Sequence, residues 1–477
     1  MKKNYLKLMA VLFAATMSTG MISCGDDDDN ETQGIPDTPI TPVDPTKDDA
    51  MSSAKQKEYL ETVALEFMDK IPSSDYRDIV DLCMYLSDTY GDSYDWSDVS
   101  DWAEDAFKAA REALGTQNTE SKTEKRGSYT YNYNYIYTEY QALLIASNFT
   151  GRFTASNGKW TRENDNDLLF VFTDKHNQQC VLKIETGGSI KKVHALELND
   201  RKDADYESNG YTYTRNYYYD RTKCTIGVPE RIVVTLTQGN SQVVKTTVQI
   251  DLGSISGEEF DISKNSLTLS VLTELSNGYR FDASKVAYTA NSNASVSFTM
   301  SKNGTSLIAM GASADVNGLP SVNVSAFSGK DFDEDDYDLD NTNGKNVLVK
   351  LDILGKVQIQ GKLADVRKFA NYMEEADYNY RDEKNYKSYI GQANALADIN
   401  LFYDGKNVKQ AAIKLEPFAC EKWDGTTYWE AEPVICFYDG TSYSTFEAFF
   451  NEKDFKNTID AFKTLANKYA ELQEQAN

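Results

Sequence analysis

Between residues 128 and 361 the chain alternates apolar and polar side chains with a period of two, and this pattern limits the fold more than any other feature. Residues 232–236 alternate in this way, a polar turn follows, and residues 244–250 alternate back. Further along, the dipeptide Asn303-Gly304 separates two alternating runs and is the strongest short hairpin signal. Successive hairpins predict a large antiparallel meander with one apolar face and one face that can meet water.

A helical period flanks this region on both sides. Before residue 116, three amphipathic stripes predict three helices, the third of which ends near Gly115. The polar segment 116–127 is typical of a linker. In the C-terminal part the helical period returns, a hairpin turns at Asp404-Gly405, and an apolar stripe over residues 455–472 predicts a long closing helix.

The first 23 residues have the layout of a secretory signal. Three lysines precede an apolar run from Leu8 to Ala15, and small residues follow it. The run is far shorter than the ~20 apolar residues that a membrane-spanning helix needs. We therefore predict a signal peptide at residues 1–23 rather than a transmembrane anchor.

The residues around the expected cleavage point resemble two known sequence motifs. The sequence MISC at residues 21–24 resembles a bacterial lipobox, and Gly25 with the four aspartates up to Asp29 is similar to the acidic export signal of surface lipoproteins in gut Gram-negative anaerobes. The resemblance covers 30 residues and concerns the cellular location of the protein alone. It implies acyl chains such as palmitate on Cys24, an anchor in the outer membrane and a folded part that faces the exterior. Several acyl chains, each gaining ~0.8 kcal/mol per buried methylene, hold a protein firmly. Two alternatives stay open. The signal can be an ordinary secretion signal in which Cys24 occurs by chance, or the lipoprotein can remain at the inner leaflet.

Charge excludes one class of partner. The net charge is −25, and removal of residues 1–23, which contain three lysines and no acidic residue, makes it −28. Nucleic-acid binding requires positive patches that neutralise phosphates, so we predict no DNA or RNA partner.

Composition divides the rest of the chain. Residues 24–50 are rich in Asp, Thr and Pro and hold almost nothing that can form a core, so they are predicted to be a lipidated, disordered tether. Three regions follow: a helical region (51–115), an antiparallel β region (128–361) and an α+β C-terminal region (362–477).

The cysteines indicate no metal framework. They are Cys24, Cys83, Cys180, Cys224, Cys420 and Cys436. If Cys24 is acylated, five remain, which cannot all pair within one chain, and their spacing contains no CxxC. Cys420 and Cys436 can flank a hairpin and form a disulfide in an oxidising compartment, or they can be buried free thiols.

Standard catalytic motifs are missing from the sequence. There is no GxGxxG, GxxxxGK[ST], HExxH or GxSxG, and the nearest approach, residues 253–257, places Ile255 where the nucleophile must stand. The chain has only two histidines, His176 and His194, which we interpret as ordinary strand-surface residues. A pair of carboxylates can hydrolyse polysaccharide, but no pair can be chosen from 74 acidic residues. No cofactor is predicted.

The acidic loop 331–340 permits two interpretations. Oxygens at Asp331, Asp333 and Asp335 suit a calcium ion, yet position six of an EF-hand loop, a glycine, is Asp336 here, and position twelve is not glutamate. The loop is either a non-standard calcium site or a solvated turn, and no metal ligand is assigned.

One strand is unusually rich in tyrosine. In an extended strand, alternate residues lie on one face, ~6.7 Å apart. The tyrosines that share this face are Tyr129, Tyr131, Tyr133, Tyr135 and Tyr137, and a second set around Arg215 repeats the pattern. Such a row can form a platform on which sugar rings stack, with hydroxyl groups at its edge. It can equally be scaffold, because tyrosine suits a half-wet sheet face.

Together these patterns predict an α+β fold with a helical N-terminal region, a large antiparallel β-meander sheet and a helix-closed C-terminal region. The predicted function is a surface-exposed lipoprotein that binds a glycan or a protein partner without catalysis, at residues 129–137. The alternative is a surface polysaccharide hydrolase that uses an unplaced carboxylate pair.

Overall fold

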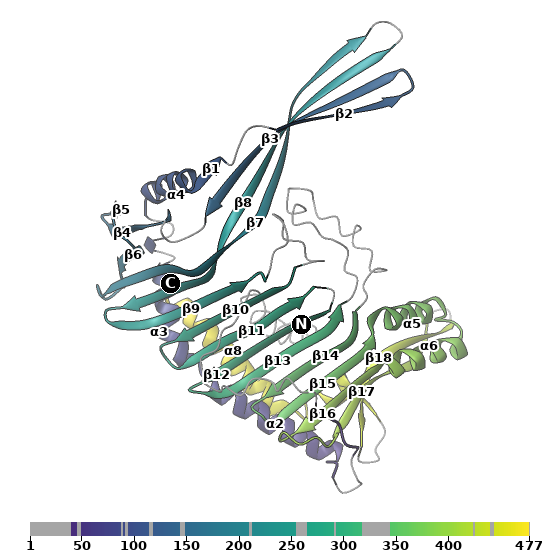
Figure 1. Ribbon diagram of the computed structural model, residues 1–477. Coiled ribbons are helices and arrows are strands. Elements are labelled where there is room, and N and C mark those ends of the chain that lie inside the picture. The colour runs from purple at the N-terminus through teal and green to yellow at the C-terminus, as the bar shows by residue number, and fades with distance from the viewer. Residues whose placement is uncertain are drawn as a thin grey trace.

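The computed structural model has an α+β fold (Figure 1), as the sequence predicts. It describes residues 40–44, 49–86, 89–90, 94–113, 118–143, 148–208, 212–253, 265–290, 292–316, 344–422, 425–438 and 443–476. Within these ranges the backbone alone is described at residues 107–113, 118, 137–143, 192–206, 219–226, 285 and 473–476.

Helices lie near both ends of the described chain, and one pair of helices, α5 and α6, interrupts the strands between them. The helices are α2 (Ser53–Lys70), the short 3-10 helix η1 (Ser73–Tyr76), α3 (Arg77–Leu86), α4 (Ser97–Ala110), α5 (Val366–Tyr378), α6 (Glu383–Leu396), α7 (Phe446–Phe449) and α8 (Lys456–Ala476). The strands before the meander are β1 (Arg111–Ala113), β2 (Asn118–Arg126), β3 (Tyr129–Leu143), β4 (Gly151–Ser156), β5 (Lys159–Glu163), β6 (Leu168–Thr173), β7 (Gln179–Ser208) and β8 (Tyr213–Gln238). Those of the meander and its end are β9 (Ser241–Asp251), β10 (Leu267–Leu275), β11 (Tyr279–Thr289), β12 (Asn293–Lys302), β13 (Thr305–Val316), β14 (Gly344–Ile353), β15 (Val357–Asp365), β16 (Ala397–Tyr403), β17 (Ala411–Glu421), β18 (Thr427–Phe437) and β19 (Ser444–Thr445).

The predicted meander is confirmed from β7 onward. Each strand from β7 to β19 pairs antiparallel with the next one in the chain. The turn between β12 and β13 has φ of 50° at Asn303 and 79° at Gly304, the left-handed values that a tight hairpin turn requires. Two pairs, β3 with β8 and β4 with β6, are parallel. Parallel pairs join segments distant in the chain, so hairpin signals do not reveal them.

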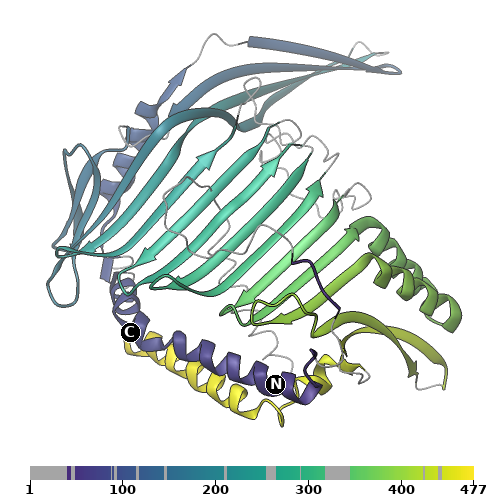
Figure 2. The same cartoon turned by 60° about the horizontal axis from the view of Figure 1, so that its bottom comes forward.

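Helices α2 and α8 lie side by side and run across the strands of the meander (Figure 2). Val63 of α2 packs with Val357 and Tyr403 of the sheet. Ile459 of α8 packs against a cluster that includes Phe449. The apolar stripes of both helices are therefore core, and the predicted helical closure of the C-terminal region is confirmed. None of the helices in the described ranges is long and apolar enough to cross a membrane.

A polar contact fastens the end of α2 to the β11–β12 hairpin. Asp75 in η1 accepts a hydrogen bond from the hydroxyl of Tyr279 at 2.7 Å and forms an ion pair with Lys302. Burial opposes ionisation of Asp75, but the hydrogen bonds from Lys302 and Tyr279 outweigh it and lower the pKa of the carboxyl. The Lys302 ammonium also lies 4.9 Å from the centre of the Tyr279 ring.

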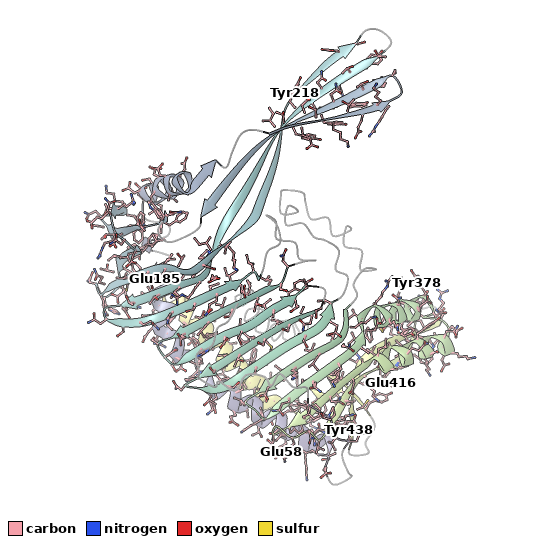
Figure 3. The ribbon with its side chains drawn as sticks, in the orientation of Figure 1. Glu58, Glu185, Tyr218, Tyr378, Glu416 and Tyr438 are labelled. Atoms are coloured by element: carbon pink, nitrogen blue, oxygen red, sulfur yellow. The ribbon has the colours of Figure 1, made fainter. Side chains whose placement is uncertain are left out.

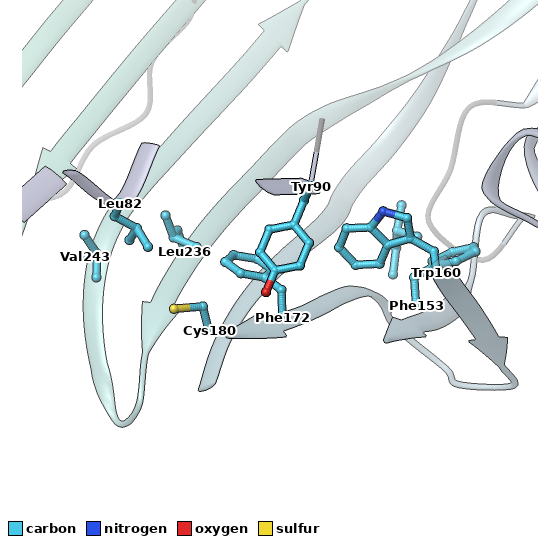
Figure 4. Packing of buried hydrophobic residues seen from close by; sticks show 9 residues of the cluster. Leu82, Tyr90, Phe153, Trp160, Phe172, Cys180, Leu236 and Val243 are labelled. Atoms are coloured by element: carbon cyan, nitrogen blue, oxygen red, sulfur yellow. The ribbon is translucent and has the colours of Figure 1, made fainter. Parts of the chain in front are cut away.

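A second core lies at the end of the sheet where α3 and α4 meet β4, β5 and β6. Figure 4 shows Tyr90 between Phe172 and Trp160, whose ring centres lie 5.5 and 5.8 Å away. Phe153 is fully buried, with Trp102 and Phe170 at 4.9 and 5.0 Å. Four of the nine buried residues in this cluster are aromatic: Tyr90, Phe153, Trp160 and Phe172.

The sheet forks at β8. Residues Tyr213–Gly227 of this strand pair with β3, whereas the same edge pairs with β9 from Arg231 onward. A register shift in β7 accompanies the fork, between Gly187 and Ile190. Gly188 there has φ of +77°, and a side chain at this position would lie 2.7 Å from Glu230. Glycine is therefore required where β7 bends out of the main sheet.

Two local predictions were wrong. The segment 116–127, predicted to be a linker, contains β2, which pairs with β3 along its whole length. The third helix ends at Ala110 rather than near Gly115, because residues 111–113 form β1 and also pair with β3. In both cases the long β3 strand supplies a backbone partner, and tertiary pairing overrides local preference.

The chain before α2 contacts the sheet. The side-chain amide of Gln360, which is 1% exposed, exchanges two hydrogen bonds with the backbone of Ile40, at 2.8 and 2.9 Å. Val43 bridges Val408, and Asp44 forms an ion pair with Lys409 at 3.0 Å. These contacts fix residues 40–44 on the sheet, at the end of the segment that the sequence predicts to be a tether.

Candidate functional site

Part of the fold projects from the main sheet as an arm (Figure 1). We define the arm as residues 118–143, 189–208 and 212–227, which comprise β2, β3 and the adjoining parts of β7 and β8. The arm contains 11 of the 31 tyrosines of the chain. It has ten basic and nine acidic residues, a net charge of +1, so the rest of the chain carries −26. The arm therefore differs in both aromatic content and charge from the body that carries it.

The register of the arm places the predicted tyrosines on one face. Residues opposite each other on paired strands share a face of the sheet, so the alternate residues of β3 and β8 gather together. We call this set the tyrosine face: Tyr129, Tyr131, Tyr133 and Tyr135 of β3 with Tyr213, Arg215 and Tyr217 of β8. Tyr129 is 45% exposed, and the other three tyrosines of β3 are half-buried. Tyr137 follows in register with Arg221, but only the backbone of both is described.

The rings of the tyrosine face stack on one another. Tyr129 stacks on Tyr213 of the neighbouring strand, with ring centres 4.9 Å apart and planes 17° apart. Tyr133 stacks on Tyr217 in the same way, at 5.4 Å and 18°. Along β3, Tyr129 and Tyr131 are nearly parallel at 6.3 Å. Because ring faces cover one another, the face presents ring edges and hydroxyl groups more than open ring faces. It is a different surface from the flat stacking platform that the sequence suggests.

Charged side chains of β2 border the tyrosine face. Glu124 forms ion pairs with Lys122 at 2.9 Å and with Arg126 at 3.2 Å. The hydrogen bond from Lys122 lowers the pKa of the Glu124 carboxyl, and the same contact raises the pKa of the Lys122 ammonium. On β8, the Arg215 guanidinium donates to the hydroxyl of Tyr217 at 3.3 Å. The face thus offers both donors and acceptors beside its aromatic rings.

The opposite face of the arm is polar. Thr123 donates to the side-chain oxygen of Asn132, and Asn132 donates to Asn216, each at 2.8 Å, so one hydrogen-bonded row crosses three strands. Ser121 and Asn134 begin a second row, at 2.8 Å. Side-chain hydrogen bonds across strands help to hold the register of these three strands. Tyr218 lies on this second face and is 37% exposed (Figure 3).

The remaining sequence candidates lie outside the described residues or form no cluster within them. Cys24 and the acidic loop 331–340 lie outside the described residues, so lipid attachment and calcium binding stay predictions. His176 is exposed in the turn between β6 and β7, and only the backbone of His194 is described, within β7. No cluster of metal-ligating side chains occurs in the ranges described.

Of the two alternatives left open for Cys420 and Cys436, a disulfide or free thiols, the structure shows free thiols. On the β17–β18 hairpin, Cys420 pairs with Tyr428 whereas Cys436 pairs with Ala412, eight residues further along the ladder. Both thiols are free, as are those of Cys83 and Cys180. Antiparallel register decides this result, because a bridge needs two cysteines at nearly opposite positions.

No described carboxyl with a resolved shift has a raised pKa. The carboxyls whose pKa is lowered are Asp75, Asp95, Glu124, Asp174, Glu230, Asp365, Asp454 and Asp460. A general acid of a glycosidase needs a raised pKa. The hydrogen bonds around Asp174, for example, come from backbone and amide groups that fix a turn.

Sequence reasoning missed β2 as part of this surface. Its signal was present, since Glu120, Lys122, Glu124 and Arg126 alternate in sign at a period of two. Comparison with protein-family models, curated proteins and solved structures found no match.

Proposed function

We propose that this protein is a surface lipoprotein that binds a glycan or a protein partner through the tyrosine face of its arm, without catalysis. The observation that carries the proposal is the arm itself: a projecting sheet that gathers six tyrosines and Arg215 on one face. Tyrosine and arginine are enriched where proteins bind partners, because each offers a large rigid contact area together with hydrogen bonds.

The charge of the arm supports the same role. The part of the chain outside the arm has a net charge of −26 and repels acidic surfaces, whereas the arm, at +1, does not. Binding through the arm therefore keeps the partner away from the acidic body. The exposed hydroxyl groups and the adjacent ion pairs of β2 suit a partner rich in hydrogen-bonding groups, as a glycan is.

The proposal includes the cellular location of the protein, which can be tested separately. Acylation at Cys24, followed by a stem up to Ile40, would display the body outside the outer membrane. Mass spectrometry of the mature N-terminal peptide should find acyl chains on Cys24, and protease treatment of intact cells should remove the body. An unmodified Cys24 would refute the anchor, and a protein left untouched by protease would refute the outward-facing position.

Binding and hydrolysis can be separated in one experiment. The chain from Gly25 to Asn477 retains every described residue and can be incubated with a panel of polysaccharides. Retardation in affinity gels without release of reducing ends is the result we expect for a binding protein. Release of reducing ends would instead establish the hydrolase.

Removing tyrosines should weaken binding. We expect Tyr131→Ala combined with Tyr135→Ala to raise the dissociation constant at least about tenfold, as loss of aromatic anchors does at other interfaces. Affinity electrophoresis of the retained polysaccharide measures the change. The matched control is Tyr218→Ala, which removes the same side chain from the opposite face of the arm and should leave affinity unchanged. Equal effects of both variants would exclude the tyrosine face as the binding surface.

A further inference from the structure

The outer edge of β2 is an open strand edge at the end of the arm. Strand β2 pairs with β3 on one side, and no strand of the described chain pairs with it on the other. Its pairing with β3 runs from Asn118 to Arg126 without a bulge. An open, regular edge presents unpaired backbone groups that can accept another strand.

The charges of β2 are arranged so that the strand complements itself. Glu120, Lys122, Glu124 and Arg126 lie on the tyrosine face, where they oppose tyrosines of β3. If two β2 strands pair antiparallel around Thr123, Lys122 of each copy faces Glu124 of the other. In the same register Glu120 of each copy faces Arg126 of the other. All four facing charged pairs then have opposite sign, an arrangement that stabilises antiparallel strands.

Neighbouring registers lack this match. A shift of the pairing centre by one residue toward the N-terminus places Lys122 opposite Lys122 and Glu120 opposite Glu124. A shift of one residue the other way places Glu124 opposite Glu124 and Lys122 opposite Arg126. Both shifts set like charges directly against each other, which destabilises a strand pair. The charge pattern therefore selects one register out of the three closest.

Charges on an edge strand can also serve to keep strands apart. Keeping strands apart does not require positive and negative charges in any particular order, and charges of a single sign would repel a second copy more strongly. In β2 the order is alternating, and the ion pairs Lys122–Glu124 and Arg126–Glu124 show that these side chains reach their neighbours at 2.9 and 3.2 Å. Lys122 and Arg126 remain 64% and 76% exposed, so they are open to a partner strand.

We propose that two copies of this chain associate through antiparallel pairing of their β2 strands, centred on Thr123. The pairing is isologous, so the two arms are related by a twofold axis and form one continuous sheet. Both tyrosine faces then lie on the same side of that sheet, which doubles the width of the candidate binding surface. The proposal concerns association and holds whether or not the tyrosine face binds a glycan.

Charge reversal tests the pairing directly. Sedimentation velocity of the chain from Gly25 to Asn477, over micromolar to millimolar concentrations, should show a monomer–dimer equilibrium. Lys122→Glu sets glutamate against Glu124 in both halves of the homodimer, and Glu124→Lys sets lysine against Lys122. Each variant alone should weaken dimerisation at least about tenfold, because two attractive pairs become repulsive. An equimolar mixture of the two variants should dimerise again, since every facing pair in the heterodimer has opposite sign.

The mixture also shows that both variants are folded. Lys125→Glu is the matched control: it makes the same change of charge on β2, but Lys125 faces Ser121 in the proposed register, so dimerisation should change little. A wild-type chain that stays monomeric over the whole concentration range would overturn the proposal. A dimer that neither single variant weakens, or a mixture that stays monomeric, would overturn it as well.

Discussion

Replacement of Phe153 by alanine is expected to lower the free energy of unfolding by about 3–5 kcal/mol. Phe153 is fully buried, and its ring meets Trp102 edge-on and stacks on Phe170. Truncation removes a large apolar side chain and leaves a cavity between elements that come from different parts of the chain. Because α4 contributes Trp102, the cavity loosens the attachment of that helix to β4 and β6.

Urea denaturation followed by tryptophan fluorescence measures this change. Tyr378→Ala is a suitable control, because Tyr378 is 75% exposed at the end of α5 (Figure 3) and its loss should alter the free energy by less than about 0.5 kcal/mol. A loss below about 1 kcal/mol for Phe153→Ala would contradict the packing described for this end of the sheet.

Tyr279→Ala is expected to have a comparable effect, about 3–5 kcal/mol, within the meander, where Tyr279 begins β11 between β10 and β12. Tyr279 is 1% exposed, its ring lies 4.8 Å from that of Tyr76, and its hydroxyl contacts Asp75. The variant removes both the ring that seats the end of α2 and one donor to the Asp75 carboxylate. Lys302 then remains as the side-chain hydrogen-bond partner that the structure shows for that carboxylate.

The conservative variant separates the two contributions. Tyr279→Phe keeps the ring and removes the hydroxyl, so it should lose only about 1 kcal/mol, the net value of a typical hydrogen bond. Chemical denaturation of both variants at neutral pH provides the comparison. Equal losses for the two variants would mean that the hydroxyl, rather than the packed ring, holds α2 on the hairpin.

The parts of the fold that sequence predicts well are those with local causes. Hairpins such as the one at Asn303-Gly304 depend on turn residues that adopt positive φ, and these can be read directly. The helices were predicted from their apolar stripes, since each stripe needs a surface to cover. The α+β class followed from these two signals together.

The parts that sequence did not predict depend on pairing between distant residues. Tyr129 and Tyr213 lie 84 positions apart, and nothing local in either strand specifies that they become parallel neighbours. Strand β2 is polar throughout, so its hydrophobic pattern is absent and only its alternating charges mark it. The sequence predicts that alternate tyrosines lie on the same face of a strand. The stacking of their rings on one another follows from the β3–β8 pairing.

Hydrogen–deuterium exchange tests the central claim, that the tyrosine face is the binding surface, most directly. The chain from Gly25 to Asn477 is labelled with and without the polysaccharide that affinity gels retain most strongly. We expect slower exchange in peptides from β3 and β8 that cover residues 129–136 and 213–218, and unchanged exchange in α2 and α8. Protection confined to the body of the sheet or to its helices, with none in the arm, would contradict the account.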